Sequence, residues 1–382
     1  MYSLGAYGSM IADRVRVEAY TEALRKTVRK GSVVVEIGTG PGIFAVLACQ
    51  LGASKVYAIE PAEIVQVARE IAAANGCADR IEFFEQLSHR VTLPTRADVM
   101  LSDLRGVLPL FQRHIPAIVD ARRRFLANGG IVIPRRDTVW AAVAEAPKPY
   151  GGIVDPWDKN TFGQNLGPAR MLAVNDGQRV CVSPEQLLTG HGLWTTLDYS
   201  TVENPDVRGN LQWTIERAGT GHGVVVWFDA ELAEGIGFSN APGTTETVYG
   251  SYFFPWTHTV RLEKGQNVCV NLQAKLVEND YVWRWTTRIE PVAGSSASPI
   301  PFEQSQLAGA VLSPQQLRKI AADYFPDLSE EGILLRRALE LMDGKLSLND
   351  IARHLAKEFP QRFSDCRQAL SFAGRVSQEY SR

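Results

Sequence analysis

Apolar and polar residues alternate along the first third of the chain in the order expected of a mixed α/β domain. Short apolar runs typical of buried parallel strands occur at Val33–Ile37, Lys55–Ile59, Ile81–Glu85, Ala97–Ser102 and Gly130–Pro134. Helical stretches separate them, among them Ile43–Leu51, Ala62–Asn75 and Leu108–Arg124. Because such an alternation builds a parallel sheet, we expect a ligand site at the carboxyl ends of the strands.

The remaining sequence divides into further segments by its pattern. Residues 2–30 carry apolar side chains at near-helical spacing, so the first domain, residues 1–136, is predicted to begin with an amphipathic helix. Strand-like runs punctuated by Gly, Asn and Pro then fill residues 137–292, which predicts an all-β barrel or sandwich. Small residues and prolines at 293–306 predict a linker, and residues 307–382 predict four short helices. Residues 150–190 are irregular and form an excursion from the β domain.

The first strand leads into a glycine-rich turn. Gly38, Gly40 and Gly42 alternate along this turn and precede a helix, an arrangement typical of nucleotide-binding α/β domains, because glycine lets the backbone approach a ligand closely. Glu60 follows the second strand, where a carboxylate can accept hydrogen bonds from ribose hydroxyls. NAD, FAD and S-adenosylmethionine all carry that ribose. The turn lacks the Gly-x-Gly-x-x-Gly spacing of a dinucleotide site, which favours a methyltransferase over a dehydrogenase.

Composition limits the other classes of function. The 382 residues are 45% apolar and 21% charged, as in an ordinary globular protein, and the net charge of −2 gives no footprint for nucleic acid or an anionic membrane. Five cysteines stand far apart, which argues against a zinc site and a disulfide framework. With no apolar run of about 18 residues and no signal sequence, we expect a cytoplasmic protein without a metal.

Several stretches resemble the protein arginine methyltransferases in order and spacing. Met10–Arg16 is similar to the family motif Met-Leu-Lys-Asp-x-Val-Arg, and Glu36–Gly42 resembles motif I of class I S-adenosylmethionine-dependent methyltransferases. Gly52–Glu60 is similar to the family's second strand, and Val182–Thr189 to a segment that opens the later strands of its barrel. The resemblance covers about residues 1–292 and implies a Rossmann-like class I methyltransferase domain followed by a β-barrel domain.

The resemblance also implies a cofactor site for S-adenosylmethionine, with S-adenosylhomocysteine as product. Arg16 would pair with the methionine carboxylate of the cofactor, since a guanidinium can hold a carboxylate by two hydrogen bonds. Glu36 and the Gly38 backbone would contact the amino-acid end. The expected cofactor-binding residues are Met10, Arg16, Glu36, Gly38, Gly40, Glu60 and, at the adenine position, Ser88 and His89.

The predicted acceptor site departs from the family pattern. Two glutamates hold the substrate guanidinium in the family, but Asp103 and Gln112 stand at these positions here. Asp103 would orient the acceptor and take its proton, or would merely cap the next helix. Arg105 adds a charge suited to a substrate carboxylate, and His114 lines the pocket.

The barrel contributes two further candidates to this site. In the segment Tyr252–Trp256, only Trp256 is retained from the family's Thr-His-Trp loop. His258 follows it and is an alternative catalytic base. Three readings remain open: N-methylation of a guanidino or other nitrogen of an amino acid or peptide, O- or ring-N-methylation of a carboxylate-bearing metabolite anchored by Arg105, and a non-catalytic scaffold that keeps the cofactor fold.

The C-terminal helices carry a second resemblance. Leu339–Leu355 is similar to a small winged-helix domain that binds leader peptides in pyrroloquinoline quinone biosynthesis. It implies a peptide partner and a role in natural-product biosynthesis, whereas a plain helical appendage remains the alternative. The family resemblance further implies a homodimer, with residues 150–190 as its dimerisation arm.

Overall fold

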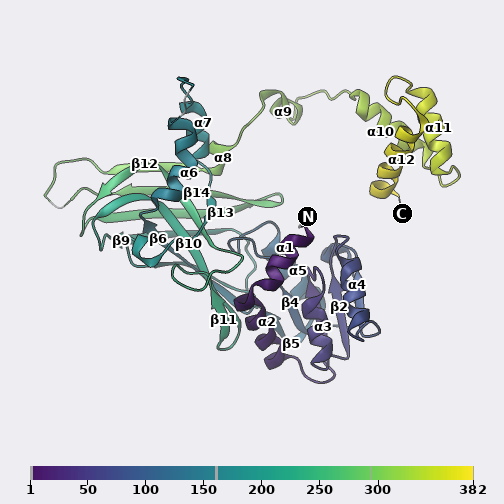
Figure 1. Ribbon diagram of the computed structural model, residues 1–382, viewed down its shortest axis with the longest axis horizontal. Helices are drawn as coiled ribbons and strands as arrows, with labels where there is room; N and C mark the ends of the chain where they lie inside the picture. The colour runs from purple at the N-terminus through teal and green to yellow at the C-terminus, as the bar shows by residue number, and fades with distance from the viewer. Residues whose placement is uncertain (1–2, 160–161, 293, 382) are drawn as a thin grey trace. The chain divides into compact units, whose positions relative to one another are not determined.

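The computed structural model describes residues 3–159, 162–292 and 294–381. They form two compact units, Met1–Ala310 and Val311–Arg382. The first unit contains a parallel sheet with flanking helices and a β domain (Figure 1), and the second is helical. Each unit has its own hydrophobic core, so we describe them separately.

The α/β part of the first unit contains a five-stranded parallel sheet in the order β3-β2-β1-β4-β5. Its strands are β1 (Val33–Ile37), β2 (Lys55–Ile59), β3 (Ile81–Phe84), β4 (Ala97–Ser102) and β5 (Leu126–Ile133). The chain order reverses between β1 and β4, and a crevice for ligands forms at the carboxyl ends of strands at such a point. The expected parallel sheet is therefore confirmed, although β5 begins earlier than predicted and includes the glycines at 129 and 130.

Helices cover both faces of this sheet. They are α3 (Ile43–Gln50), α4 (Val65–Ala74), the short 3-10 helix η1 (Ser88–Arg90) and α5 (His114–Phe125). The N-terminal segment forms α1 (Leu4–Ala12) and α2 (Arg14–Thr27) rather than one helix. The break falls at Asp13, whose carboxylate accepts the Arg16 backbone N–H and so caps the start of α2.

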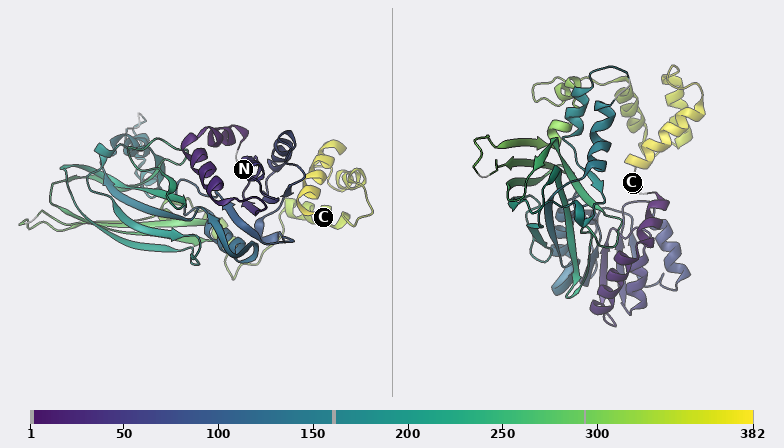
Figure 2. Two further views of the ribbon diagram at one scale, coloured as in Figure 1. Left: turned by 90° about the horizontal axis from the view of Figure 1, so that it is seen from below. Right: turned by 60° about the vertical axis from the view of Figure 1, so that its left-hand side comes forward.

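The β domain consists of two antiparallel sheets that curve around a shared core (Figures 1 and 2). The larger sheet has the order β7-β12-β10-β6-β8, with β11 paired to β10, and the smaller has the order β15-β14-β13-β9. The larger sheet contains β6 (Arg136–Ala144), β7 (Gln178–Val180), β8 (Gly192–Asp198), β10 (Gly219–Ala233), β11 (Ile236–Ser239) and β12 (Ser251–Leu262). The smaller contains β9 (Val207–Thr214), β13 (Asn267–Val277), β14 (Asp280–Ile289) and β15 (Ile300–Ser305). This confirms an α/β methyltransferase-type plan with a barrel-like domain.

The irregular excursion contains regular structure. Helices α6 (Pro147–Asp158) and α7 (Gly167–Ala173) and the short helix η2 (Pro184–Gln186) lie within or beside residues 150–190. Tyr150 and Val154 of α6 pack with Val225 and Trp227, on the face of the larger sheet that points away from the shared core. The excursion thus covers the outside of its own sheet, where apolar side chains would otherwise meet water.

The predicted linker at 293–306 is wrong over its second half. Residues 300–305 form β15, which pairs with β14, and Phe302 and Gln304 of this strand are buried. Because β15 is an edge strand, the prolines around it remove no hydrogen bond from the interior of the sheet. The short helix α8 (Gln306–Gly309) follows, and the division between the units falls after Ala310.

The helical unit contains α9 (Pro314–Lys319), α10 (Glu330–Leu341), α11 (Leu348–Glu358) and α12 (Cys366–Tyr380). Ser329, Ser347 and Asp365 cap the last three helices with side-chain hydrogen bonds. These three helices enclose one core, whereas the residues of α9 are exposed. In the part of the chain that the structure describes, no helix is both long and apolar enough to cross a membrane.

Candidate active site

The glycine turn after β1 requires its glycines for two reasons. Gly38, Gly40 and Gly42 have φ angles of 75°, 53° and 80°, which side-chain-bearing residues seldom adopt. A Cβ atom at Gly38 would also collide with Leu104, and one at Gly40 would lie 3.0 Å from the ring of Tyr7. The loop after β4 and helix α1 therefore both press on the turn that we expected to approach a ligand.

Two buried glutamates flank this turn. Glu60 accepts hydrogen bonds from the backbone N–H of Gly40 at 2.9 Å and of Ala62 at 3.0 Å. Glu36 accepts the hydroxyl of Thr39 at 2.5 Å. Burial raises the pKa of both carboxyls, and that of Glu36 to about 8, although the Thr39 hydrogen bond and the Arg16 charge oppose the shift. Glu36 therefore holds a proton at neutral pH in this state.

Cofactor binding is expected to release the proton of Glu36. The family resemblance implies that the cationic amino group of the cofactor lies beside Glu36. Such a charge would lower the pKa of Glu36 from about 8, so binding at neutral pH should expel up to one proton and tighten as the pH rises toward 8. Calorimetric titration in buffers of different ionisation enthalpy measures this proton, and Glu36→Gln should remove it. A binding enthalpy that does not depend on the buffer would contradict the prediction.

The same shift affects folding stability in the opposite direction. The folded-state pKa of Glu36, about 8, lies above its ordinary value of 4.5, so the folded chain keeps a proton that the unfolded chain loses. The contribution of Glu36 to stability is therefore present below pH 4.5 and falls as the pH rises to about 8.

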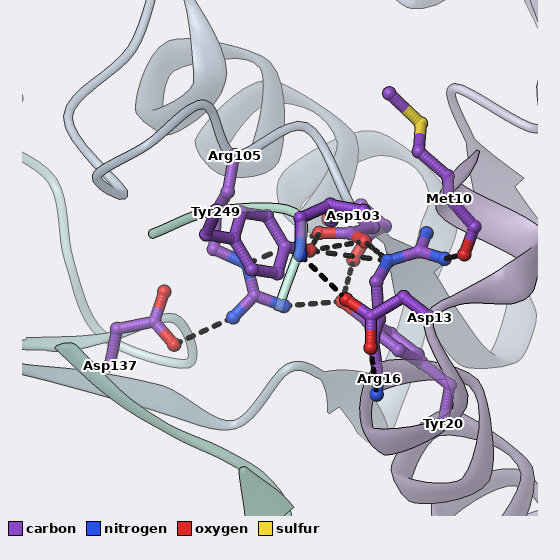
Figure 3. A network of polar contacts seen from close by, with 10 residues as sticks. Met10, Asp13, Arg16, Tyr20, Asp103, Arg105, Asp137 and Tyr249 are labelled. Atoms are coloured by element: carbon purple, nitrogen blue, oxygen red, sulfur yellow. Dashed lines mark hydrogen bonds and ion pairs between the residues drawn. The ribbon is translucent and has the colours of Figure 1, made fainter. Parts of the chain in front are cut away.

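Asp103 lies at the centre of a buried polar network after β4 (Figure 3). Its carboxylate accepts hydrogen bonds from Arg16 Nε at 2.6 Å, from the Tyr249 hydroxyl at 2.7 and 2.9 Å, and from Arg105 Nε at 3.2 Å. Burial alone would raise the pKa of Asp103, but Arg16 and Arg105 lower it to about 2. Arg16 also donates to the Met10 carbonyl at 3.2 Å. Asp103 therefore stays ionised and does not cap a helix, since Arg113 occupies the position before α5.

The barrel contributes Tyr249 to this network, a residue that is not among the candidates predicted from the sequence. The Tyr249 ring stacks on Phe238 with centroids 5.7 Å apart, and its backbone neighbour Val248 donates to the Asp13 carboxylate at 2.8 Å. Asp13 thus joins the start of α2 to the barrel loop. The signal was present in the sequence, because Thr247 and Tyr249 have the spacing of the threonine and the aromatic residue in the family's Thr-His-Trp loop.

The structure contradicts the expected role of Arg105 as an anchor for a substrate carboxylate. Its side chain is 0% exposed, and its guanidinium donates to Asp137 at 2.9 Å, to Asp103 and to the Tyr20 hydroxyl. The ring centroid of Phe228 lies 5.5 Å from the guanidinium carbon. A buried cation with this set of partners serves the contact between the two halves of the unit and presents no surface to a substrate.

His114 is buried and extends this network to Tyr199 of the β domain. Its Nε2 lies 3.1 Å from the Tyr199 hydroxyl, which donates to Asp137 at 2.6 Å. Burial, with the Arg105 charge, lowers the pKa of His114 to about 3, so the imidazole is neutral. Its Nδ1 has no hydrogen-bond partner among the residues that the structure describes.

Gln112 lies in a loop, because α5 begins later than expected. The helix predicted from Leu108 starts at His114, and the preceding residues form a loop. Gln112 is exposed with a φ of 44°, and its backbone N–H donates to Asp280 at 3.0 Å. The second carboxylate position of the family is thus filled by a residue whose backbone is held by the β13–β14 hairpin.

The two barrel residues expected in the site are not there. Trp256 is fully buried, donates to the Thr287 hydroxyl at 3.1 Å and stacks on Phe302, so it belongs to the core between the sheets. His258 is exposed beside Phe302. β12 begins at Ser251, two residues after Tyr249, and His258 lies seven residues further along this strand. Because a strand advances by about 3.3 Å per residue, His258 is more than about 20 Å from Ser251. His258 is therefore not positioned as a base for the Asp103 site.

The remaining candidates occupy the edges of the site. Met10 is half-buried and contributes its carbonyl to Arg16, as described above. Ser88 is buried in η1, and its carbonyl accepts Arg124 at 2.7 Å, whereas His89 is exposed. Among the described residues, no group of three or more His, Cys, Asp and Glu side chains has the geometry to hold a metal ion.

Comparisons with known proteins agree with this architecture. A family model for the ribosomal protein L11 methyltransferase (PrmA) matches residues 19–147, and one for the arginine methyltransferase oligomerization subdomain matches residues 136–287. The chain is arginine-methyltransferase-like. Among solved structures, a chain of the Trypanosoma brucei PRMT1 enzyme–prozyme heterotetrameric complex with AdoHcy has a TM-score of 0.73 at 18% identity, covering 79% of this chain and 98% of that one. Protein arginine methyltransferase 10 of Arabidopsis thaliana has a TM-score of 0.69 at 22% identity, covering 80% and 98%.

Curated relatives carry the same family name. Probable protein arginine N-methyltransferase 6 of Arabidopsis thaliana is 29% identical over 257 residues, which are 65% of this chain and 59% of that protein. Protein arginine N-methyltransferase 2 of Mus musculus is 32% identical over 230 residues, 57% of this chain and 51% of that protein. The arginine-methyltransferase-like chain thus spans little more than half the length of these relatives, and its activity and substrate are argued from its own site.

Proposed function

We propose that this protein is an S-adenosylmethionine-dependent N-methyltransferase that acts on a guanidino nitrogen of an amino acid or peptide. The supporting observation is the convergence of the glycine turn, Glu36, Glu60, Arg16 and Asp103 at the carboxyl ends of β1, β2 and β4. Parallel sheets bind their ligands at this place. Of the similar structures, the trypanosomal complex holds AdoHcy.

The chain's own residues fit the cofactor. Glu36 is a buried acid whose hydrogen bond comes from the uncharged Thr39, so a cationic amino group would be its natural partner. Arg16 would hold the carboxylate at the same end, the Gly38 backbone would lie beside it, and Glu60 would hold the ribose. When bound, the cofactor supplies an electrophilic methyl group on a sulfonium.

Asp103 would position the acceptor nitrogen. In this structure its carboxylate is engaged by Arg16, Arg105 and Tyr249, which together use most of its hydrogen-bonding capacity. We propose that Arg16 exchanges Asp103 for the cofactor carboxylate, which leaves one side of Asp103 to accept an N–H of the acceptor. Arg105 and Tyr249 would then keep this carboxylate ionised and in place while a nitrogen is aligned with the methyl group.

The two other readings fare differently. Methylation of a carboxylate-bearing metabolite loses its anchor, because Arg105 is buried and already paired. A non-catalytic scaffold would have no need of a buried ionised Asp103 beside the glycine turn, since burying a charge is costly. The geometry therefore favours transfer to nitrogen.

Calorimetric titration with S-adenosylmethionine and S-adenosylhomocysteine, repeated with free arginine present, tests this proposal. We expect cofactor binding that arginine strengthens, because the acceptor would occupy the side of Asp103 that Arg16 vacates. Cofactor binding that does not respond to arginine would indicate that the acceptor is a peptide or a different nitrogen. If neither cofactor binds, the enzyme reading fails and the scaffold remains.

We also propose that the helical unit recruits a peptide and that the protein acts as a homodimer in the cytoplasm. The resemblance to a leader-peptide-binding domain and the separate core of α10, α11 and α12 support the first proposal, and with it a role in natural-product biosynthesis. The match to an oligomerization subdomain supports the second. The same titration on residues 1–310, with a candidate precursor peptide in place of arginine, tests recruitment. Undiminished peptide binding without residues 311–382 would exclude it.

A further inference from the structure

A cavity lies on the β domain, beside the loop that carries Tyr249. Its volume is about 420 Å³, within the range of small-ligand sites. One wall is formed by the chain that leaves β7, Val180–Ser183, and the other by the loop Asn240–Ser251. Its lining is rich in hydroxyl and amide groups, and Glu246 is the charged residue that lines it. We call it the β7 groove.

The loop that walls this groove also carries Tyr249. Asn240 closes the loop at its neck: it accepts the Phe228 backbone N–H at 2.7 Å, and its side-chain amide donates to the Gly250 carbonyl. Arg179 of β7 donates to the Tyr249 carbonyl at 3.0 Å. Because the Tyr249 hydroxyl contacts Asp103, a ligand in the groove would lie against the segment that holds the proposed acceptor residue.

Two features of the groove suit an extended peptide. It lies between two chain segments that continue from the β7–β12 pair, since Val180 pairs with Ser251 and the lining runs on from both residues. Thr247 lines the groove, and its buried hydroxyl has no hydrogen-bond partner within the described residues. An unpaired buried hydroxyl is costly, and a change of its χ1 rotamer would offer it to a bound peptide.

We infer that the β7 groove binds the segment of a peptide acceptor that flanks the methylated residue. The inference rests on the proposed function, because it assigns a second contact region to the same acceptor. An extended segment lies between Val180–Ser183 and the 240–251 loop. Glu246 accepts the Cys181 thiol at 3.1 Å and lies 3.8 Å from Arg179, and a basic residue of the peptide would compete with Arg179 for this carboxylate. Free arginine is too short to occupy the groove and the Asp103 site together, so the groove selects peptides over the free amino acid.

Site-selective labelling of Cys181 tests the groove. Cys181 lines it and is exposed. Cys366 on α12 is an exposed cysteine of the other unit and serves as the control, because the short peptides used here carry no leader segment for the helical unit to recruit. Two variants, Cys269→Ser with Cys366→Ser and Cys269→Ser with Cys181→Ser, each leave one exposed thiol for pyrene maleimide. Methyl transfer is then measured to free arginine and to peptides with arginine between three randomised residues on each side.

A label on Cys181 is expected to lower kcat/KM for the peptides by about 10-fold or more, mainly through KM, and to change transfer to free arginine by less than about 2-fold. A label on Cys366 should change neither. An equal loss for both substrates, or no loss for the peptides, would overturn the inference.

A second measurement is independent of turnover. The peptide library should slow alkylation of Cys181 by N-ethylmaleimide at least about 3-fold, and should leave the rate at Cys366 unchanged, as followed by intact mass. Protection without transfer to any acceptor would support the groove and contradict the proposed function. Equal alkylation with and without the library would overturn the groove, whatever the activity.

Discussion

Asp103→Asn is expected to lower methyl transfer by about 10²- to 10⁴-fold, because the carboxylate both orients the acceptor and takes up its charge or proton. The amide is close in size and still accepts the Tyr249 hydroxyl, which lies 2.7 Å from Oδ2 in the native chain. The substitution therefore removes the negative charge that faces Arg16 and Arg105 and keeps the shape of the side chain. Cofactor affinity should change far less than turnover, because Arg16 would already have turned toward the cofactor carboxylate.

Single-turnover transfer and calorimetric cofactor binding, measured on the same preparation, separate these effects. Asp79→Asn, a change of the same kind at an exposed position, is the matched control and should leave both measurements unchanged. Near-native turnover in Asp103→Asn would remove Asp103 from the mechanism. Loss of cofactor binding together with turnover would instead assign Asp103 to the cofactor site.

Arg105→Met is expected to destabilise the first unit by about 3–5 kcal/mol, the usual cost of leaving a buried charge without its partner. Arg105 and Asp137 are both 0% exposed and lie 2.9 Å apart. Removing the guanidinium leaves the Asp137 carboxylate buried without its ion-pair partner. Burial already raises the pKa of that carboxyl, although Arg105 opposes the shift. Urea unfolding of residues 1–310, with and without the substitution, measures the loss.

The double variant Arg105→Met with Asp137→Asn shows whether the loss comes from the stranded charge. Asparagine keeps an acceptor for the Tyr199 hydroxyl, which lies 2.6 Å from the native carboxylate. We expect the double variant to be more stable than the sum of the single losses predicts, with a coupling of about 1–3 kcal/mol. Additive losses would show that Arg105 acts through its packing on the aromatic rings rather than through Asp137.

Agreement between sequence and structure is best where the chemistry is local. The glycine turn requires positive φ angles that glycine adopts freely, and Glu60 follows a short strand whose length fixes its place. Both were predictable because strand, turn and helix adjoin in the chain. The four C-terminal helices are local in the same sense, and in the structure Ser329, Ser347 and Asp365 cap the last three.

The barrel side of the site was the weakest prediction. Trp256 matches the tryptophan of the family's Thr-His-Trp loop in residue type, but it lies in the core. The loop that contacts Asp103 comes earlier in the chain and does so through Tyr249. Residue type alone does not show which of several aromatic residues faces the other domain. The linker was misplaced for a related reason, because the pairing of β15 with β14 does not follow from its own Pro-rich sequence.

The sequence by itself determined the parallel sheet, the glycine turn and the acids that follow the strands, because each depends on residues within one strand–turn–helix unit. Only the tertiary structure decided what Asp103 and Arg105 do. Their partners Arg16, Tyr249 and Asp137 lie 87, 146 and 32 residues away from them in the chain. A charge in a loop is equally compatible with solvent, substrate or an ion pair, and burial against distant residues selects among these.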